Sequence, residues 1–171
     1  MKTLLITILL GYLATASVAD AQPTDQERSQ IFPKADYCRQ TGALDGGYFC
    51  EAWRTGRDGE SDKLLGYILI NTLDYRSAEM RALVAISLVN GEIVKLLVNG
   101  PEIIEQEFLE QFEGKNLDSK FEIAKTLDDL LVVPAKIKAI SGKVEISEEI
   151  AKAVSALMKS ALNSPKLTFA K

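Results

Sequence analysis

The stretch VPAKIKAISGKVEISEEIAKAVSAL, Val133–Leu157, decides how this chain folds around its candidate site. It predicts a short extended segment, a Ser-Gly turn and an amphipathic helix. The apolar residues of that helix recur on one face, at Ile150, Val154, Leu157 and Met158. A turn that leads into a helix N-terminus suits a phosphate, because unpaired N–H groups and the helix dipole both point at it. Ser141, Gly142 and Lys143 are therefore the candidate binding residues.

The N-terminus has the three parts of a secretory signal. Lys2 supplies a positive charge, Leu4–Leu13 is an apolar run too short to span a bilayer, and Ala19–Ala21 forms a small-x-small cleavage site. We expect residues 1–21 to be removed and residues 22–171 to form one domain, periplasmic or secreted and without a membrane span. An uncleaved N-terminal anchor is the alternative, and the shortness of the apolar run disfavours it.

Composition excludes several classes of function. The chain carries a net charge of −4 and no basic stripe with interleaved aromatic residues, which argues against a nucleic-acid partner. It contains no histidine, so histidine-activated nucleophiles, histidine zinc sites and histidine-ligated haem are excluded. The acidic loop Asp58–Asp62 lacks the spacing of a calcium-binding EF-hand and indicates a solvated turn. We predict neither a catalytic residue nor a metal site.

The chain has two cysteines, Cys38 and Cys50, at a spacing that is neither a CxxC pair nor a haem-attachment motif. In an exported protein the default state of such a pair is a disulfide, which is our prediction. A redox-active dithiol is the alternative, although no neighbouring residue in the sequence indicates a depressed thiol pKa.

The strongest local signal for secondary structure is a β-hairpin. The β-rich runs Arg81–Val89 and Glu92–Val98 flank Asn90-Gly91, a pair that supplies the positive φ angles of a type I′ turn. Further strands are predicted at Phe49–Trp53 and Leu64–Asn71, separated by a turn cluster at residues 56–62.

Three segments carry helix signals. They are Pro101–Phe112, Phe121–Leu131 and Ser147–Leu162. In the first, Ile104, Phe108 and Phe112 are expected to face the core. In the last, Ser147 is the expected N-cap. The order of strands, hairpin and helices predicts an α+β fold: one domain with an antiparallel or mixed sheet and packed helices.

Four stretches of the chain resemble one known family. The run Lys138–Val144 is similar to the Asp-Ala-x-Ser-Gly-Ala-Thr motif of the FMN-binding domain found in Rnf and Nqr electron-transport complexes and in periplasmic regulators of nitrous-oxide respiration. The segments Ile31–Asp36, Gly66–Leu69 and Phe108–Lys115 resemble its Phe-Pro-x-Ala-Asp, Gly-Tyr-x-Phe and Phe-Leu-x-x-Phe-x-Gly-Lys elements. Their order and spacing fit the family over nearly the whole mature chain.

The resemblance implies an exported electron-transfer protein that uses FMN. In that family the last Thr of the motif can carry FMN through a phosphoester bond, but here Val144 has no hydroxyl. The resemblance therefore implies non-covalent FMN, with the phosphate over Ser141 and Gly142 and the charge of Lys143 in place of the covalent link. A membrane redox complex or a periplasmic electron-transfer protein is the implied partner, and an electron carrier or non-catalytic domain is favoured over a stand-alone enzyme.

Three alternatives remain open at this point. The first is a flavin-free relative that acts as an interaction or maturation partner of a membrane redox complex. The second is an exported binding module unrelated to redox chemistry. The third is covalent attachment of FMN at Ser141 or Ser147 instead of at Val144.

Overall fold

The computed structural model describes residues 22–132 and 136–169, and its fold is α+β, as predicted. Five strands form one antiparallel sheet whose spatial order follows the order of the chain. These strands are β1 (Tyr37–Leu44), β2 (Gly47–Arg54), β3 (Lys63–Tyr75), β4 (Ala78–Ser87) and β5 (Ile93–Asn99). The other elements are α1 (Asp25–Ile31), α2 (Gln106–Glu110), β6 (Ile123–Ala124), α3 (Leu127–Val132), β7 (Ile137–Lys138) and α4 (Val144–Asn163).

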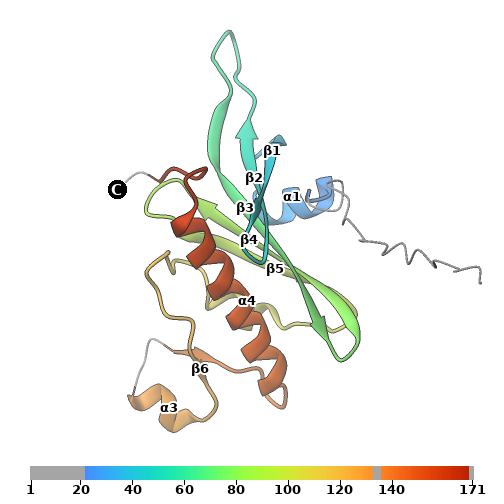
Figure 1. The fold of residues 1–171 in the computed structure, drawn as a ribbon, viewed down its shortest axis with the longest axis vertical. Coiled ribbons are helices and arrows are strands. Elements are labelled where there is room, and N and C mark those ends of the chain that lie inside the picture. Colours follow the sequence, from blue (N-terminus) through green and yellow to red (C-terminus); the bar gives the residue numbers. More distant parts are fainter. Residues whose placement is uncertain (1–21, 133–135, 170–171) are drawn as a thin grey trace, which may run out of the picture.

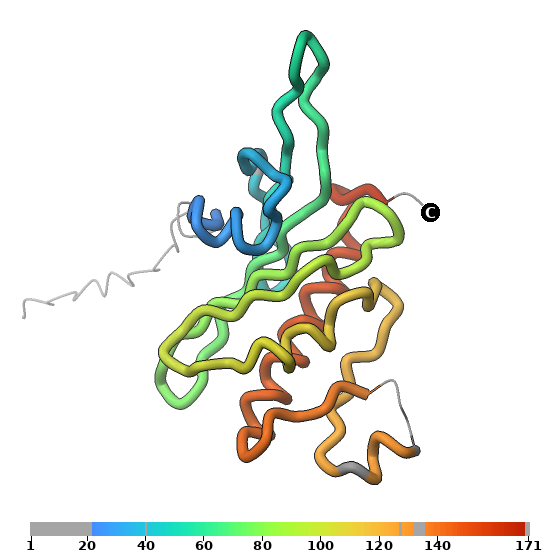
Figure 2. Tube along the Cα trace, turned by 180° about the vertical axis from the view of Figure 1, so that it is seen from behind, coloured from blue at the N-terminus to red at the C-terminus, as the bar shows by residue number. Residues whose placement is uncertain are grey.

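The sheet buries apolar side chains on both of its faces. Helix α4 lies across one face (Figure 1), over a large cluster with members from β3, β4, β5 and α2. Helix α1 lies on the other side (Figure 2), over a smaller cluster. In β3, Tyr67 and Leu69 belong to the α4 side, whereas Ile68 and Ile70 belong to the α1 side. Burial on both faces explains why β3 is a continuous apolar run in the sequence.

The hairpin predicted at Asn90-Gly91 is confirmed. Asn90 has φ 56° and Gly91 has φ 57°, the two positive angles of a type I′ turn, and the turn joins β4 to β5. A second turn of this kind joins β3 to β4, where Arg76 and Ser77 have φ 51° and 63°. Neither residue is a glycine, and the pairing of Tyr75 with Ala78 in the flanking strands holds the turn in this conformation.

The helix predicted over Pro101–Phe112 is much shorter in the structure. Only Gln106–Glu110 is helical, and the N-cap Glu105 has an extended ψ of 130°. The core-facing part of the prediction is confirmed, because Phe108 and Phe112 are buried. The residues before Glu105 stay non-helical and turn a backbone carbonyl toward Lys143, as described below.

The predicted helix Phe121–Leu131 is only partly present. Its first half contains strand β6, which pairs in parallel with β7, and only its second half forms helix α3. The side chain of Asp129 accepts bonds from the backbone N–H groups of Lys125 (2.9 Å) and Thr126 (3.0 Å), which starts the helix late. The sequence also allowed this segment to end as a strand at Val132-Val133; Val132 instead ends α3, and Val133 lies outside the described residues.

Candidate functional site

The three predicted binding residues form the turn that leads into α4. A backbone bond from Lys143 N–H to the carbonyl of Ile140 (3.0 Å) closes this turn. Gly142 has φ +72°, a left-handed conformation that L side chains rarely adopt. Ser141 and Gly142 are exposed and Lys143 is half-buried. The turn therefore presents its backbone to solvent at the start of the helix.

Helix α4 begins one turn earlier than the sequence predicted. Its first residue is Val144 and its N-cap is Lys143, whose side chain makes no capping bond. The first N–H groups of a helix lack intrahelical partners, and a helix of 20 residues adds the positive end of its dipole. The N-terminus of α4 is consequently suited to an anion.

Ser147 is not the N-cap but lies buried inside the first turns of α4. Its hydroxyl donates to the carbonyl of Lys143 (2.9 Å) and accepts from the backbone N–H of Ile140 (3.0 Å). The residue has no exposed surface, so its hydroxyl is not accessible to a flavin phosphate. Through these two hydrogen bonds, Ser147 instead links the turn to the first turn of the helix.

Two cations flank the turn, and each has an acidic partner. The Lys143 ammonium donates to the carbonyl of Ile103 (2.9 Å) and lies 3.7 Å from a carboxylate oxygen of Glu105. Arg76, from the β3–β4 turn, lies 3.1 Å from a carboxylate oxygen of Glu145. The bond to Glu145 raises the pKa of Arg76, which is charged in any case. The Arg76–Glu145 pair is largely solvent-exposed and the Lys143–Glu105 pair is partly exposed, so each contributes little to stability.

Apolar surface adjoins these charges. Ile103 exposes 82% of its surface, the highest value among the large apolar residues of the described chain. The guanidinium of Arg76 lies 5.1 Å from the centre of the Tyr75 ring. The site thus combines backbone donors, two cations, an aromatic ring and an exposed aliphatic side chain. Such a set can hold an anion with an apolar body.

Hollows of the described surface lie elsewhere along α4. One, of about 500 Å³, lies between the C-terminal half of α4 and the β1–β2 turn, where Asp45 and Ser160 are among the lining residues. Another, of about 570 Å³, runs between α4 and residues 121–123. Neither hollow is lined by Ser141, Gly142 or Lys143, and since Ser141 and Gly142 are exposed, a ligand at the turn would lie on the surface.

The sequence did not point to Tyr75, Arg76, Ile103 or Glu105 as neighbours of the turn. The β3–β4 turn meets α4 because the long strands of this hairpin carry it to the helix N-terminus, which local patterns do not reveal. One signal was present: Tyr75-Arg76-Ser77 interrupts two apolar runs and marks an exposed connection.

Both cysteines lie on the α1 side of the sheet. The structure holds them as free thiols that come within 3.4 Å of each other. The predicted disulfide thus stays a prediction, now with the two residues in contact.

Comparisons with known proteins give no assignment. No model of a protein family matches the chain, and no curated protein matches its sequence. Within residues 22–132 and 136–169, no helix is long and apolar enough to cross a membrane, and no group of histidine, cysteine or acidic residues is arranged to hold a metal ion.

Proposed function

We propose that this protein is an exported electron-transfer protein that binds FMN non-covalently, with the phosphate at Ser141, Gly142 and Lys143. The observation that carries the proposal is the left-handed turn at Gly142, which opens directly into the uncapped N-terminus of α4. Partial positive charge, free N–H groups and the Lys143 ammonium meet at this point. The place of this turn before the long last helix also agrees with the family resemblance of Lys138–Val144.

Different residues would contact the phosphate and the isoalloxazine ring of FMN. The Ser141 hydroxyl and the first backbone N–H groups of α4 would donate to the phosphate. Lys143 and Arg76 would turn from Glu105 and Glu145 toward it. Ile103 and the Tyr75 ring offer the apolar contact that the isoalloxazine needs. When bound, FMN supplies the electron chemistry itself.

The acidic partners of the two cations favour a second candidate function. Glu105 and Glu145 already neutralise Lys143 and Arg76, and a phosphate must displace them. In a flavin-free relative these ion pairs would simply fix the end of α4 against the β3–β4 turn and residues 103–105. The protein would then act as an interaction or maturation partner of a membrane redox complex.

Titration of FMN fluorescence with the purified protein separates the two functions. We expect quenching on binding, and Lys143→Glu should weaken the affinity about ten- to a hundredfold, because a charge-assisted contact of roughly 1.5–3 kcal/mol becomes repulsive. Riboflavin lacks the phosphate, so it should bind more weakly and should not respond to this substitution.

Lys152→Glu is the matched control, since Lys152 is exposed on α4 beyond its first turns and carries the same charge. It should leave FMN affinity within about threefold of the unchanged protein. If FMN fluorescence stays constant at high micromolar protein, the electron-transfer proposal is wrong and the flavin-free function replaces it.

A further inference from the structure

We propose that Cys38 and Cys50 form a reversible dithiol–disulfide pair beneath α1, in which Cys38 is the sulfur that exchanges with external disulfides. Cys38 lies on β1 opposite Ala52, and Cys50 lies two residues away on β2. The β1–β2 register shifts between Arg39 and Gly42, next to this pair. The proposal is independent of FMN binding, because the pair lies on the other side of the sheet from α4.

The two thiols are close enough to join with little movement. They come within 3.4 Å, and a disulfide has an S–S length of about 2.05 Å, so the approach required is about 1.4 Å. An irregularity in strand pairing allows a local shift more easily than a regular ladder does. Cys38 thus lies next to the irregular part of the β1–β2 pairing.

The two sulfurs differ in access. Cys50 has no exposed surface and lies in the cluster beneath α1, whereas Cys38 is only partly buried at the edge of that cluster. Since β1 is an edge strand, a disulfide-bearing molecule can approach Cys38 but not Cys50. This asymmetry assigns the attacking role to Cys38 and the resolving role to Cys50.

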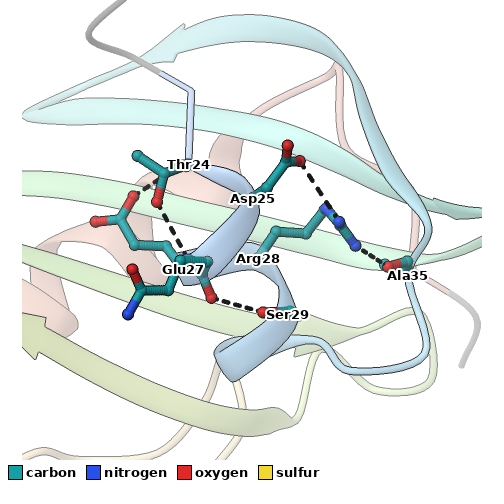
Figure 3. Close-up of polar contacts among 7 residues, drawn as sticks. Thr24, Asp25, Glu27, Arg28, Ser29 and Ala35 are labelled. Atoms are coloured by element: carbon teal, nitrogen blue, oxygen red, sulfur yellow. Dashed lines mark hydrogen bonds and ion pairs between the residues drawn. The ribbon is translucent and has the colours of Figure 1, made fainter.

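The charge of Arg28 favours the same assignment. Figure 3 shows that the Arg28 side chain contacts Asp25, on the same helix α1, and donates to the carbonyl of Ala35, just before β1. The Nε atoms of Arg28 and Arg81 are buried without a hydrogen-bond partner. A hydrogen bond from Cys50 and the charge of Arg28 lower the pKa of Cys38, although burial and Asp25 oppose this.

The pKa of the other thiol, Cys50, shifts in the opposite direction. The hydrogen bond to Cys38 and burial raise the pKa of Cys50, while Arg81 opposes the rise. Of the two, Cys38 therefore supplies the thiolate, which is the nucleophilic form.

The exchange balances with an external disulfide as the oxidant. The Cys38 thiolate attacks one sulfur of RSSR, which forms a mixed disulfide and releases RS⁻. Cys50 then loses its proton to solvent and attacks the Cys38 sulfur, which forms the Cys38–Cys50 bond and releases a second RS⁻. The two thiols are oxidised by two electrons, RSSR is reduced to two RSH, and the two protons end on the released thiols.

The region around the two cysteines is packed with both thiols free. With free thiols, Cys50 already packs in an apolar cluster with Ile68 and Ile70, and β1 and β2 are paired on either side of the two cysteines. A disulfide in a region that is already packed can form and break without unfolding the protein. This differs from the disulfides of small domains that lack a sufficient hydrophobic core.

Equilibration of the exported protein in glutathione buffers of graded ratio tests reversibility. After acid quenching and alkylation, intact mass should show a reversible change between the dithiol and the disulfide. In Cys50→Ser, oxidised glutathione should add once, at Cys38, because the resolving thiol is gone. In Cys38→Ser, the buried Cys50 should add none. A disulfide that persists in a large excess of reduced glutathione, or thiols that never join, would refute the proposal.

A second measurement isolates the role of Arg28. Alkylation of Cys38 in the reduced Cys50→Ser protein should slow about threefold at pH 7 when Arg28→Gln removes the charge, and Arg28→Lys should restore the rate. Circular dichroism of both variants confirms that they are folded. Equal rates in the two variants would show that Arg28 serves only as a structural contact to Ala35 and would remove it from the proposed site.

Discussion

At the scale of single residues, Gly66 and Gly142 serve the fold in different ways. A Cβ atom at Gly66 would lie 2.1 Å from the carbonyl oxygen of Ile86 and 3.0 Å from the ring of Phe32. The first contact is with backbone of the neighbouring strand, which cannot move alone. At Gly142 a Cβ atom would meet nothing within 4 Å, so only the φ of +72° favours glycine there.

We predict that Gly66→Ala destabilises the protein by about 2–3 kcal/mol, since the added methyl group must push β4 or Phe32 away from β3. Gly142→Ala should cost only about 1 kcal/mol, because the residue must hold a left-handed conformation in open space. Urea unfolding followed by circular dichroism gives both values. A cost at Gly66 no larger than at Gly142 would mean that β3 and β4 separate more easily than their packing indicates.

At the scale of the elements, the start of α4 depends on the buried hydroxyl of Ser147. This group accepts the Ile140 N–H and donates to the Lys143 carbonyl, and so joins the turn to the helix. The acidic residues after Ser147 resemble a first helical turn, but the helix starts earlier because Ile146 is buried with the core. Tertiary packing thus overrides a good local N-cap signal.

We predict that Ser147→Ala destabilises the protein by about 1–3 kcal/mol, because the buried Ile140 N–H loses its acceptor. Ser155→Ala is the matched control on the same helix; Ser155 makes no hydrogen bond through its side chain among the described residues, so the change should stay within about 0.5 kcal/mol. The difference between the two variants in thermal or urea unfolding measures the bond. Similar losses of unfolding free energy for both variants would show that the Ser147 hydroxyl is dispensable and that the turn is stable without it.

Elements with a local chemical cause could be predicted from the sequence. Asn90-Gly91 strongly favours a hairpin turn, and the apolar spacing of Ser147–Leu162 favours a helix packed on the core. The short parallel pairing of β6 with β7 could not be predicted, since it depends on residues that meet only after folding. For the same reason Arg76 could not be predicted as part of the candidate site, because its neighbour Glu145 is 69 residues away in the chain.

At the scale of the whole molecule, one sheet separates the two proposed sites. The turn before α4 belongs to the side with the large core, and the cysteine pair belongs to the side covered by α1. The two clusters share the strands β3 and β4, which lie at the centre of the sheet and contribute residues to both faces. These strands should therefore be the most stable part of the protein, and the two sites should respond separately to ligand and to oxidation.

Hydrogen exchange tests this arrangement. Amides of Tyr67–Ile70 in β3 and Ala82–Ile86 in β4 should exchange last, only through global unfolding, because each strand is paired on both sides and buried on both faces. Amides of α3 should exchange first among the elements, since this helix is short and its Leu131 is 81% exposed. Mass-spectrometric exchange at low urea gives the order. Protection of α3 equal to that of β4 would contradict a core confined to the five-stranded sheet and its covering helices, because α3 could then open only together with the whole molecule.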